Sequence, residues 1–244
     1  MLKQISLLIL CAVAIVLFAT PVHACTSAVV SGKVTLDGRP LLWKNRDTDF
    51  MRNHVDYVKG ERYDFIAVVN SANAYLKEAW MGTNSAGFAL MNTQSYNLVD
   101  VKGDEERGAA NGRVIYRALE VCATVEDFCH FLDTISKPSD IEANFGVIDA
   151  QGGAAMFEVD YYKYVMYDAN NPKDAPYGYI ARTNFSFAGK VNEGAGYVRY
   201  MEADQVLMKA SATGNITPQF IFNDLSRSFR NRMLDIDLRS GGYN

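Results

Sequence analysis

The sequence predicts an α+β domain with antiparallel sheets, and three observations support this prediction. Segments with strand character come in blocks, and helical segments come in separate blocks, which differs from the strict alternation of βαβ proteins. Turn sequences such as Asp-Gly-Arg-Pro at 37–40 separate neighbouring strand segments, as in hairpins. Of the 244 residues, the 220 that follow residue 24 suffice for one domain with a substantial core.

The first half of the chain is predicted to consist mostly of strands. Residues 25–47 contain β-branched and apolar residues on both sides of the turn at 37–40, which indicates a hairpin. A second turn is expected at 83–87, where Thr-Asn-Ser-Ala-Gly lies between two apolar segments. The expected strands are 25–36, 41–47, 63–71, 77–82 and 88–97.

The second half combines helices with further strands. A helical block is expected from about 112 to 135, and Thr124 with the acidic residues after it can begin its second half. Further strands are expected at 144–150, 154–168 and 177–185, and helices at about 194–210 and 219–233, the last one begun by Thr217-Pro218. The closing sequence DLRSGGYN has no obvious finishing element, which leaves open that the polypeptide continues.

The first 24 residues have the pattern of a secretory signal peptide. Lys3 precedes an apolar run from Ile5 to Phe18, and Val22-His23-Ala24 places small residues at the positions that signal peptidase inspects. This apolar run is short for a bilayer span, and no other long apolar run follows it. We therefore predict a signal peptide at 1–24, cleavage before Cys25, a periplasmic or secreted protein, and no stable membrane span after cleavage.

The charge balance is mildly acidic, with 24 basic and 28 acidic side chains and a formal net charge of −4. No tract of Lys or Arg and no zinc-finger spacing is present, so nucleic acid is excluded as an expected partner. The predicted mature chain keeps only His54 and His130, which are too few for a metal cluster. We expect a small-molecule substrate and neither a metal nor another cofactor, and a homo-oligomer is left open.

The predicted mature chain keeps three of the 4 cysteines, and an odd number in an exported protein points to an unpaired thiol. In a continuous helix, Cys122 and Cys129 would lie about 10 Å apart, which is too far for a disulfide. We therefore expect both to be buried apolar thiols. Cys25 remains, at the predicted cleavage junction.

A cysteine nucleophile needs a base. His130 lies in an apolar segment and His54 in a polar one, so neither is favoured, although a Cys25–His54 pair is left open. Cleavage after Ala24 would supply another base, because Cys25 would then carry a free α-amino group. Such groups usually have a pKa of about 7.7–8.0, so a substantial fraction is neutral at physiological pH. One residue would then supply both the nucleophile and the base.

Cys25-Thr26-Ser27, followed about twenty residues later by Asn45-Arg46-Asp47, resembles the opening of the linear-amide hydrolases of the N-terminal nucleophile (Ntn) superfamily. This group includes choloylglycine (bile salt) hydrolases, penicillin V acylases and acyl-CoA:6-aminopenicillanic acid acyltransferase-like proteins. The resemblance implies a four-layer αββα sandwich, no cofactor, and cleavage of a linear, non-peptide amide through a thioester on Cys25. It also implies that Asp47 contacts the amine or the thiol of Cys25.

Further matches to this group follow in order along the chain. The segment GTNSAGFALMN at 82–92 places Asn92 at the oxyanion pocket, and ARTNF at 181–185 assigns Asn184 as a donor to the oxyanion. The segment AGYVRY at 195–200 places Arg199 near the nucleophile. Lys44, a candidate substrate-binding residue, stands where bile salt hydrolases carry an arginine.

Two alternatives stay open. A dipeptidase of the related Cys-Thr-Thr type would share the opening and differ chiefly in the pocket that receives the substrate amine. A surface lipoprotein without enzymatic activity would instead carry lipid on Cys25, although His23 is unusual in a lipidation signal. Asn184-Phe185-Ser186 also matches a glycosylation sequon.

Overall fold

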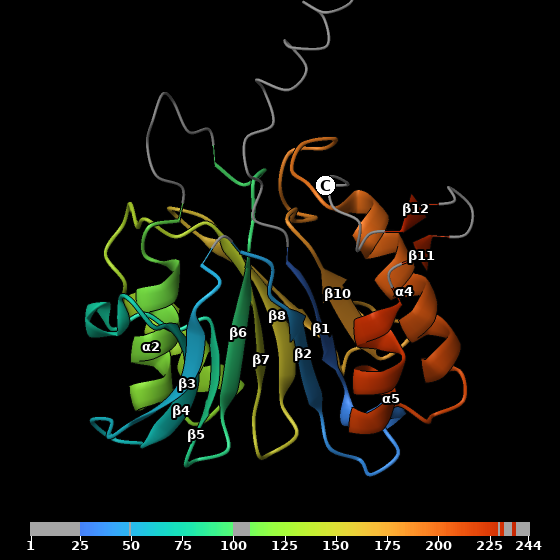
Figure 1. Cartoon of the computed structure of the whole chain (residues 1–244), viewed down its shortest axis with the longest axis horizontal. Coiled ribbons are helices and arrows are strands. Elements are labelled where there is room, and N and C mark those ends of the chain that lie inside the picture. Colours follow the sequence, from blue (N-terminus) through green and yellow to red (C-terminus); the bar gives the residue numbers. More distant parts are fainter. Residues whose placement is uncertain (1–24, 49, 100–107, 229, 232–235, 238–244) are drawn as a thin grey trace, which may run out of the picture.

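The structure, a computed structural model of the chain, describes residues 25–48, 50–99, 108–228, 230–231 and 236–237. The predicted signal peptide at 1–24 lies outside these ranges. Two antiparallel sheets lie face to face, with helices on both outer sides (Figure 1). The four-layer αββα arrangement that we expected is therefore present.

The larger sheet has seven strands in the order β3-β4-β5-β6-β7-β8-β9, and each is antiparallel to its neighbours. The strands are β3 (Asn53–Val58), β4 (Phe65–Asn70), β5 (Met81–Asn84), β6 (Ala89–Gln94), β7 (Ala143–Ile148), β8 (Ala154–Val159) and β9 (Tyr164–Asp168). Strands β7 and β8 are buried along almost their whole length, because helices cover one face and the other sheet covers the second face.

Helices α2 (Asn111–Val121) and α3 (Val125–Thr134) pack on the outer face of the larger sheet. Their buried side chains, among them Leu119 and Phe128, form one core with strand residues such as Phe145. Helix α3 begins as expected. The Thr124 hydroxyl accepts a hydrogen bond from Asp127 N at 3.0 Å, and the Asp127 carboxylate accepts one from Thr124 N at 3.1 Å.

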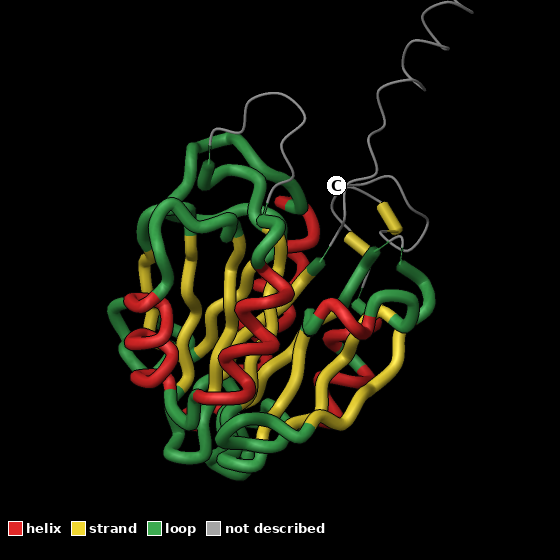
Figure 2. The backbone as a smooth tube through the Cα atoms, turned by 90° about the vertical axis from the view of Figure 1, so that its left-hand side faces the viewer, coloured by secondary structure: helices red, strands yellow, loops and turns green. Residues whose placement is uncertain are grey.

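The smaller sheet has three strands in the order β10-β1-β2, all antiparallel. The strands are β1 (Thr26–Val30), β2 (Leu41–Asn45) and β10 (Tyr179–Arg182), and helices α4 (Tyr197–Ser211) and α5 (Pro218–Asn223) cover the outer side of this sheet (Figure 1). An apolar cluster that includes Val29, Met91 and Met156 fills the space between the two sheets. Figure 2, turned by 90°, shows the two layers of strands one behind the other.

Some expected elements differ from the structure. Residues 53–58 form the edge strand β3, where we predicted no strand. Most of their side chains are exposed, so the segment has no buried face and its sequence lacks the apolar pattern that indicates a strand. The expected strand at 154–168 is two strands. The turn between them is stabilised by the Asp160 carboxylate, which accepts hydrogen bonds from Tyr162 N and Lys163 N.

The predicted hairpin at 25–47 is confirmed, because β1 pairs with β2 along its whole length. Within it, a short 3-10 helix (Gly32–Val34) replaces the end of the first expected strand. Helix α5 ends at Asn223, earlier than expected, because the 3-10 helix η3 follows it. The remaining short elements are η2 (Ala74–Leu76), η3 (Leu225–Arg227), β11 (Arg230–Asn231) and β12 (Ile236–Asp237). None of the helices in the described ranges has the length and apolarity needed to cross a membrane.

Candidate active site

Cys25 lies directly before β1, the central strand of the smaller sheet. Strand β1 pairs with β2 on one side and with β10 on the other, so the segments that follow β2 and β10 lie on either side of Cys25. This pairing brings Asp47 and Asn184 to the same cysteine, although they are 22 and 159 residues away in the sequence.

Asn184 holds the backbone nitrogen of Cys25. Cys25 N donates a hydrogen bond to Asn184 Oδ1 at 2.9 Å, and Arg199 Nη2 donates to the same oxygen at 2.9 Å. Because both partners are donors, the amide atom that faces them is the oxygen. Asn184 Nδ2 donates one hydrogen bond to the backbone oxygen of Gln94 at 2.9 Å, and the residue is fully buried. A glycan on this amide would disrupt these contacts.

The thiol of Cys25 lies close to Asp47. Cys25 Sγ is 3.9 Å from the backbone oxygen of Asp47, and only 8% of Cys25 is exposed. The Asp47 side chain is exposed, and within the described ranges its carboxylate accepts no hydrogen bond. The main chain of Asp47 therefore contacts the thiol, and Asp47 is also one of the residues that line a cavity next to Cys25.

Arg199, in the first turn of α4, contacts the other side of Cys25. Its Nη1 donates to the backbone oxygen of Cys25 and to Thr26 Oγ1, the latter at 3.0 Å. Gly196 has a φ of 88°, and a Cβ atom there would lie 2.5 Å from Arg199 Nη2, so a glycine is required. Burial lowers the pKa of Arg199, while Cys25 and then Asp47 act in the opposite direction.

Lys44 and Asn92 both line the cavity that contains Cys25. Lys44 Nζ donates to the backbone oxygen of Trp80 at 3.0 Å and to Asn92 Oδ1 at 3.1 Å. Because a lysine only donates, it fixes the orientation of the Asn92 amide, whose Nδ2 has no acceptor among the described residues. Burial lowers the pKa of Lys44 to about 8, against the opposing effect of Cys25.

Cys25, Lys44, Asp47 and Asn92 line a cavity of about 270 Å³, whereas Asn184 and Arg199 contact the backbone of Cys25 and are not among its lining residues. Its wall combines the thiol, the polar groups described above and three aromatic side chains. The lining residues are Cys25, Lys44, Arg46, Asp47, Thr48, Phe50, Trp80, Asn92, Gln94, Tyr96 and Gly108. A nucleophile, nearby cations and an inward amide donor are the components that acyl transfer requires.

A buried ion pair supports the segment that carries Asn184. Arg182 Nε donates to Glu158 Oε1 at 2.6 Å, and the two side chains are 3% and 0% exposed. Glu158 also accepts hydrogen bonds from Phe187 N at 2.9 Å and Ala188 N at 2.7 Å. Glu158 of β8 therefore holds the chain on both sides of Asn184, which keeps the amide in register with Cys25.

The other thiols and the histidines lie away from this cavity. Cys122 and Cys129 are free, and Cys122 is buried as expected, whereas Cys129 is only half-buried. Burial raises the pKa of Cys122 to about 12, so that thiol is a poor nucleophile. His130 is exposed on α3, and His54 Nδ1 lies 2.9 Å from Ser71 Oγ. In the described part of the chain, no three His, Cys, Asp or Glu side chains are grouped so that they could hold a metal ion.

Seven of the eleven lining residues received no role from the sequence, among them Arg46, Trp80 and Gln94. A signal existed for Arg46, because it follows Lys44 by two positions and an extended chain places such residues on the same side. Trp80 precedes β5 and Gln94 ends β6, and only the packing of the two sheets brings them to Cys25.

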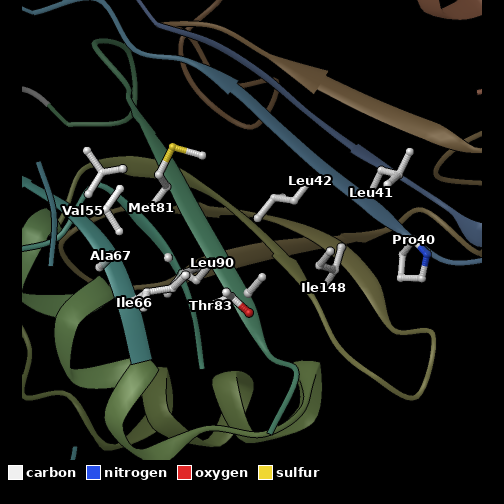
Figure 3. Close-up of a pocket in the computed structure, with 13 residues that line it drawn as sticks. Pro40, Leu41, Leu42, Val55, Ile66, Ala67, Met81, Thr83, Leu90 and Ile148 are labelled. Atoms are coloured by element: carbon white, nitrogen blue, oxygen red, sulfur yellow. The ribbon is translucent and has the colours of Figure 1, made fainter. Parts of the chain in front are cut away.

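A second cavity, of about 390 Å³, lies between β2 and strands β4 to β6 (Figure 3). Leu41 and Leu42 line one side, and Ile66, Met81 and Leu90 line the other. Its lining residues include no ionisable side chain. We refer to it below as the apolar groove.

Residues 35–220 match the model of a protein family described as acyl-coenzyme A:6-aminopenicillanic acid acyl-transferase. Among solved structures, a variant of conjugated bile acid hydrolase from Clostridium perfringens superimposes with a TM-score of 0.55 at 14% identity, over 85% of this chain and 80% of that chain. The Caenorhabditis elegans ortholog of N-acylethanolamine-hydrolyzing acid amidase has a TM-score of 0.54 at 15% identity, over 82% of this chain and 89% of that chain. No curated protein sequence matches the chain. The two structures share the αββα fold with this protein.

Proposed function

Because the chain belongs to the acyl-coenzyme A:6-aminopenicillanic acid acyl-transferase family, and so to the Ntn group that its opening sequence resembles, we propose that it is an exported amide hydrolase with Cys25 as its nucleophile. Its substrate is an N-acyl compound with a linear C–N amide bond. Removal of residues 1–24 activates the enzyme, because it exposes the α-amine of Cys25.

The observation that carries this proposal is the 2.9 Å contact between Cys25 N and Asn184 Oδ1. After cleavage, the same nitrogen is an amine held by a buried acceptor beside its own thiol. An amine in this position can remove the thiol proton without help from a histidine. Both histidines of the mature chain lie outside the cavity lining, which agrees with such a mechanism.

In the proposed reaction, the α-amine of Cys25 takes the thiol proton, and the sulfur attacks the carbonyl carbon of the amide. The carbonyl oxygen becomes negatively charged, and Asn92 Nδ2, which lines the cavity, donates a hydrogen bond to it. The resemblance assigns the second N–H of Asn184 Nδ2 as a further donor, which requires the fully buried Asn184 to become accessible from the cavity. The C–N bond then breaks, and the ammonium returns its proton to the leaving amine. Water, deprotonated by the same amine, hydrolyses the thioester and restores the thiol.

The charged groups around Cys25 assist these steps. Arg199 and Lys44 place positive charge beside the sulfur, which stabilises the negative charge that forms during attack. Asp47 orients the α-amine, since its carboxylate is the acidic group among the described residues that line the cavity. Lys44 also contributes to substrate binding, and it keeps the Asn92 amide directed at the substrate oxygen.

Cys25→Ala, assayed in the processed protein against a panel of N-acyl amides and dipeptides, tests the nucleophile. We expect turnover to be lost and the unfolding midpoint to be unchanged, because the side chain loses only its sulfur. Retained amidase activity would refute the assignment. Turnover of dipeptides alone by the native protein would favour the dipeptidase alternative.

A form with one additional residue before Cys25 tests the base. Its nitrogen is an amide that cannot accept a proton, so we expect it to be inactive. Equal activity of the extended and the processed forms would exclude the α-amine as base. The intact mass of the exported protein distinguishes the lipoprotein alternative, because an added diacylglycerol on Cys25 would rule out the proposed enzyme.

A further inference from the structure

Three buried polar side chains form a row across the inner face of the larger sheet. Thr93 of β6 is paired in register with Asn144 of β7, and Asn144 is paired with Glu158 of β8. Their exposed fractions are 0%, 0% and 1%, in the layer between the two sheets. Buried polar groups are costly unless they form hydrogen bonds, so the partners of this polar row indicate what it does.

Asn144, the central member of the polar row, holds the residues on both sides of Asn184. Its Nδ2 donates to the backbone oxygen of Thr183 at 3.2 Å and to that of Phe185 at 3.1 Å. Its Oδ1 accepts a hydrogen bond from Ser186 Oγ at 2.5 Å. One amide of the larger sheet therefore fixes the main chain directly before and directly after Asn184.

The two outer members of the polar row hold the same segment. Thr93 Oγ1 donates to the backbone oxygen of Thr183 at 2.7 Å and accepts from Asn144 Nδ2 at 3.1 Å. Glu158, as described above, holds both ends of the segment 182–188. All three members of the row therefore bind the segment that carries the amide in contact with Cys25.

This segment depends on such contacts because it lies beyond the end of its strand. Strand β10 ends at Arg182, and the described residues after it form one isolated bridge, between Asn184 and Ala195. The Asn184 oxygen that accepts from Cys25 N lies within this stretch. Position matters here, since a displacement of about 1 Å in an active site can cost about 100-fold in rate.

We propose that Asn144 is a positioning residue that keeps Asn184 Oδ1 directed at the α-amine of Cys25. The inference rests on the proposed function, because it concerns the amine that acts as the base there. Stability alone does not require a buried polar row, because well-packed apolar residues of similar volume are often at least as stabilising.

The main test compares Asn144→Ala with Asn84→Ala in the processed protein. Asn84, which ends β5, is also buried and also donates from Nδ2 to two backbone oxygens, those of Leu119 and Cys122 in the outer layer. The two variants lose equivalent hydrogen bonds and should lose similar stability. We expect only Asn144→Ala to lower kcat, by about 10- to 100-fold, with KM within about threefold. Equal losses of kcat in both variants would overturn the proposal.

The pH profile of kcat/KM is a readout that a general loss of stability would not move. The contact with Asn184 Oδ1 favours the charged form of the α-amine, so a displaced amide lowers the pKa of that amine. We expect the acid limb to move to lower pH by about 0.5–1 unit in Asn144→Ala only, and an unchanged profile would contradict the proposal. Both variants keep the titratable and charged groups that face Cys25, which are Lys44, Arg46, Asp47, Tyr96 and Arg199.

Thr93 supplies a second pair of variants, which decides the matter if Asn144→Ala does not fold. Thr93→Val keeps the shape of the side chain but cannot donate to the Thr183 oxygen, whereas Thr93→Ser keeps the hydroxyl. We expect Thr93→Val to lower kcat by about 3- to 10-fold and Thr93→Ser to stay within about twofold of the native protein. Equal kcat values for these two variants would overturn the role of the polar row.

An NMR titration with ¹³C-labelled cysteine measures the pKa of the α-amine without turnover. The processed chain contains Cys25, Cys122 and Cys129, and the Cys25 signal is the one that Cys25→Ala lacks. We expect the amine to titrate at lower pH in Asn144→Ala than in Asn84→Ala or the native protein. If the native protein cleaves no N-acyl amide, the proposed function fails, but this shift would still support the positioning role. The same titration midpoint in all three proteins would overturn that role.

Discussion

Two cavities lie along the same strands, and they differ in chemistry more than in size. Along β2, Lys44 lines the cavity of Cys25 and Leu42 lines the apolar groove. Along β6, Asn92 lines the cavity of Cys25 and Leu90 lines the apolar groove. Residues two positions apart in a strand lie on the same face. The character of the wall therefore changes from cationic to apolar within two residues.

The comparison shows why size is a poor guide to function in this protein. The apolar groove is larger, at about 390 Å³ against about 270 Å³, but its lining residues carry no nucleophile, base or charged group. The smaller cavity contains the thiol, two cations and an amide whose orientation is fixed by Lys44. If this contrast is functional, substitutions in the two cavities must have very different effects on activity.

The largest effect is expected for Asn92→Asp. This substitution keeps an oxygen for Lys44 and replaces the amide nitrogen that we assign to the oxyanion. Loss of one such donor typically lowers kcat by about 10²–10³-fold, and we expect at least this with little change in KM. Thr83→Val in the apolar groove is the control, with kcat expected to stay within about twofold. Similar losses for both variants would break the contrast.

An intermediate effect is expected for Lys44→Gln, measured as stability. Burial lowers the pKa of Lys44 from 10.5 to about 8, so the folded protein binds the proton less strongly than the unfolded chain. The stability of the native protein must therefore rise as the pH increases from about 8 toward 10.5, as the cost of the buried charge disappears. The glutamine is neutral at every pH and keeps N–H groups for Trp80 and Asn92.

Urea unfolding of the native protein and Lys44→Gln at pH 7, 8.5 and 10 measures this difference. We expect the variant to be more stable at pH 7, by about 1–3 kcal/mol, and the advantage to shrink as the pH rises. Lys59→Gln, at an exposed position, serves as control. Its difference in unfolding free energy from the native protein should not shrink in this way between pH 7 and pH 10. A constant advantage of Lys44→Gln would show that the charge of Lys44 is not responsible.

The smallest effect is expected for Ile66→Thr, at the rim of the apolar groove. Ile66 is 46% exposed, and threonine keeps the β-branched shape that suits a strand. We expect kcat/KM to change by less than about twofold and stability by about 0.5 kcal/mol. A tenfold loss with substrates that carry a long acyl chain would instead make the groove part of the substrate site and remove the contrast.

Much of the fold could be predicted from local sequence patterns. The hairpin of β1 and β2, the capped start of α3 at Thr124 and the start of α5 at Thr217 each depend on neighbouring residues and are present as expected. Strand β3 was missed, because an edge strand without a buried face has no clear alternation. The break between β8 and β9 depends on hydrogen bonds of one carboxylate, that of Asp160, which the apolar pattern does not show.

The candidate site was predictable in part. Cys25, Asp47, Asn92, Asn184, Arg199 and Lys44 were selected through the resemblance to Ntn hydrolases, and the structure places all of them around one cysteine. The hydrogen bonds that each of these side chains makes could not be predicted from the sequence. Asn184 presents its oxygen to Cys25 and Asn92 presents its oxygen to Lys44, and these orientations depend on which donors the fold places beside each amide.

The sequence by itself determined the membership in the family, through matches along residues 35–220, and the hairpin of β1 and β2, which depends on neighbouring residues. The processing site before Cys25 stays a prediction from the sequence. Only the tertiary structure decided that β1 lies between β2 and β10, and so that Asn184 reaches the Cys25 nitrogen over 159 residues. It also decided that Arg46 lies at the wall of the same cavity with the neutral amides of Asn53 and Asn70 as its hydrogen-bond partners among the described residues. Charge balance and amide orientation depend on every neighbour in space, and neighbours from distant segments are assigned only when the two sheets pack together.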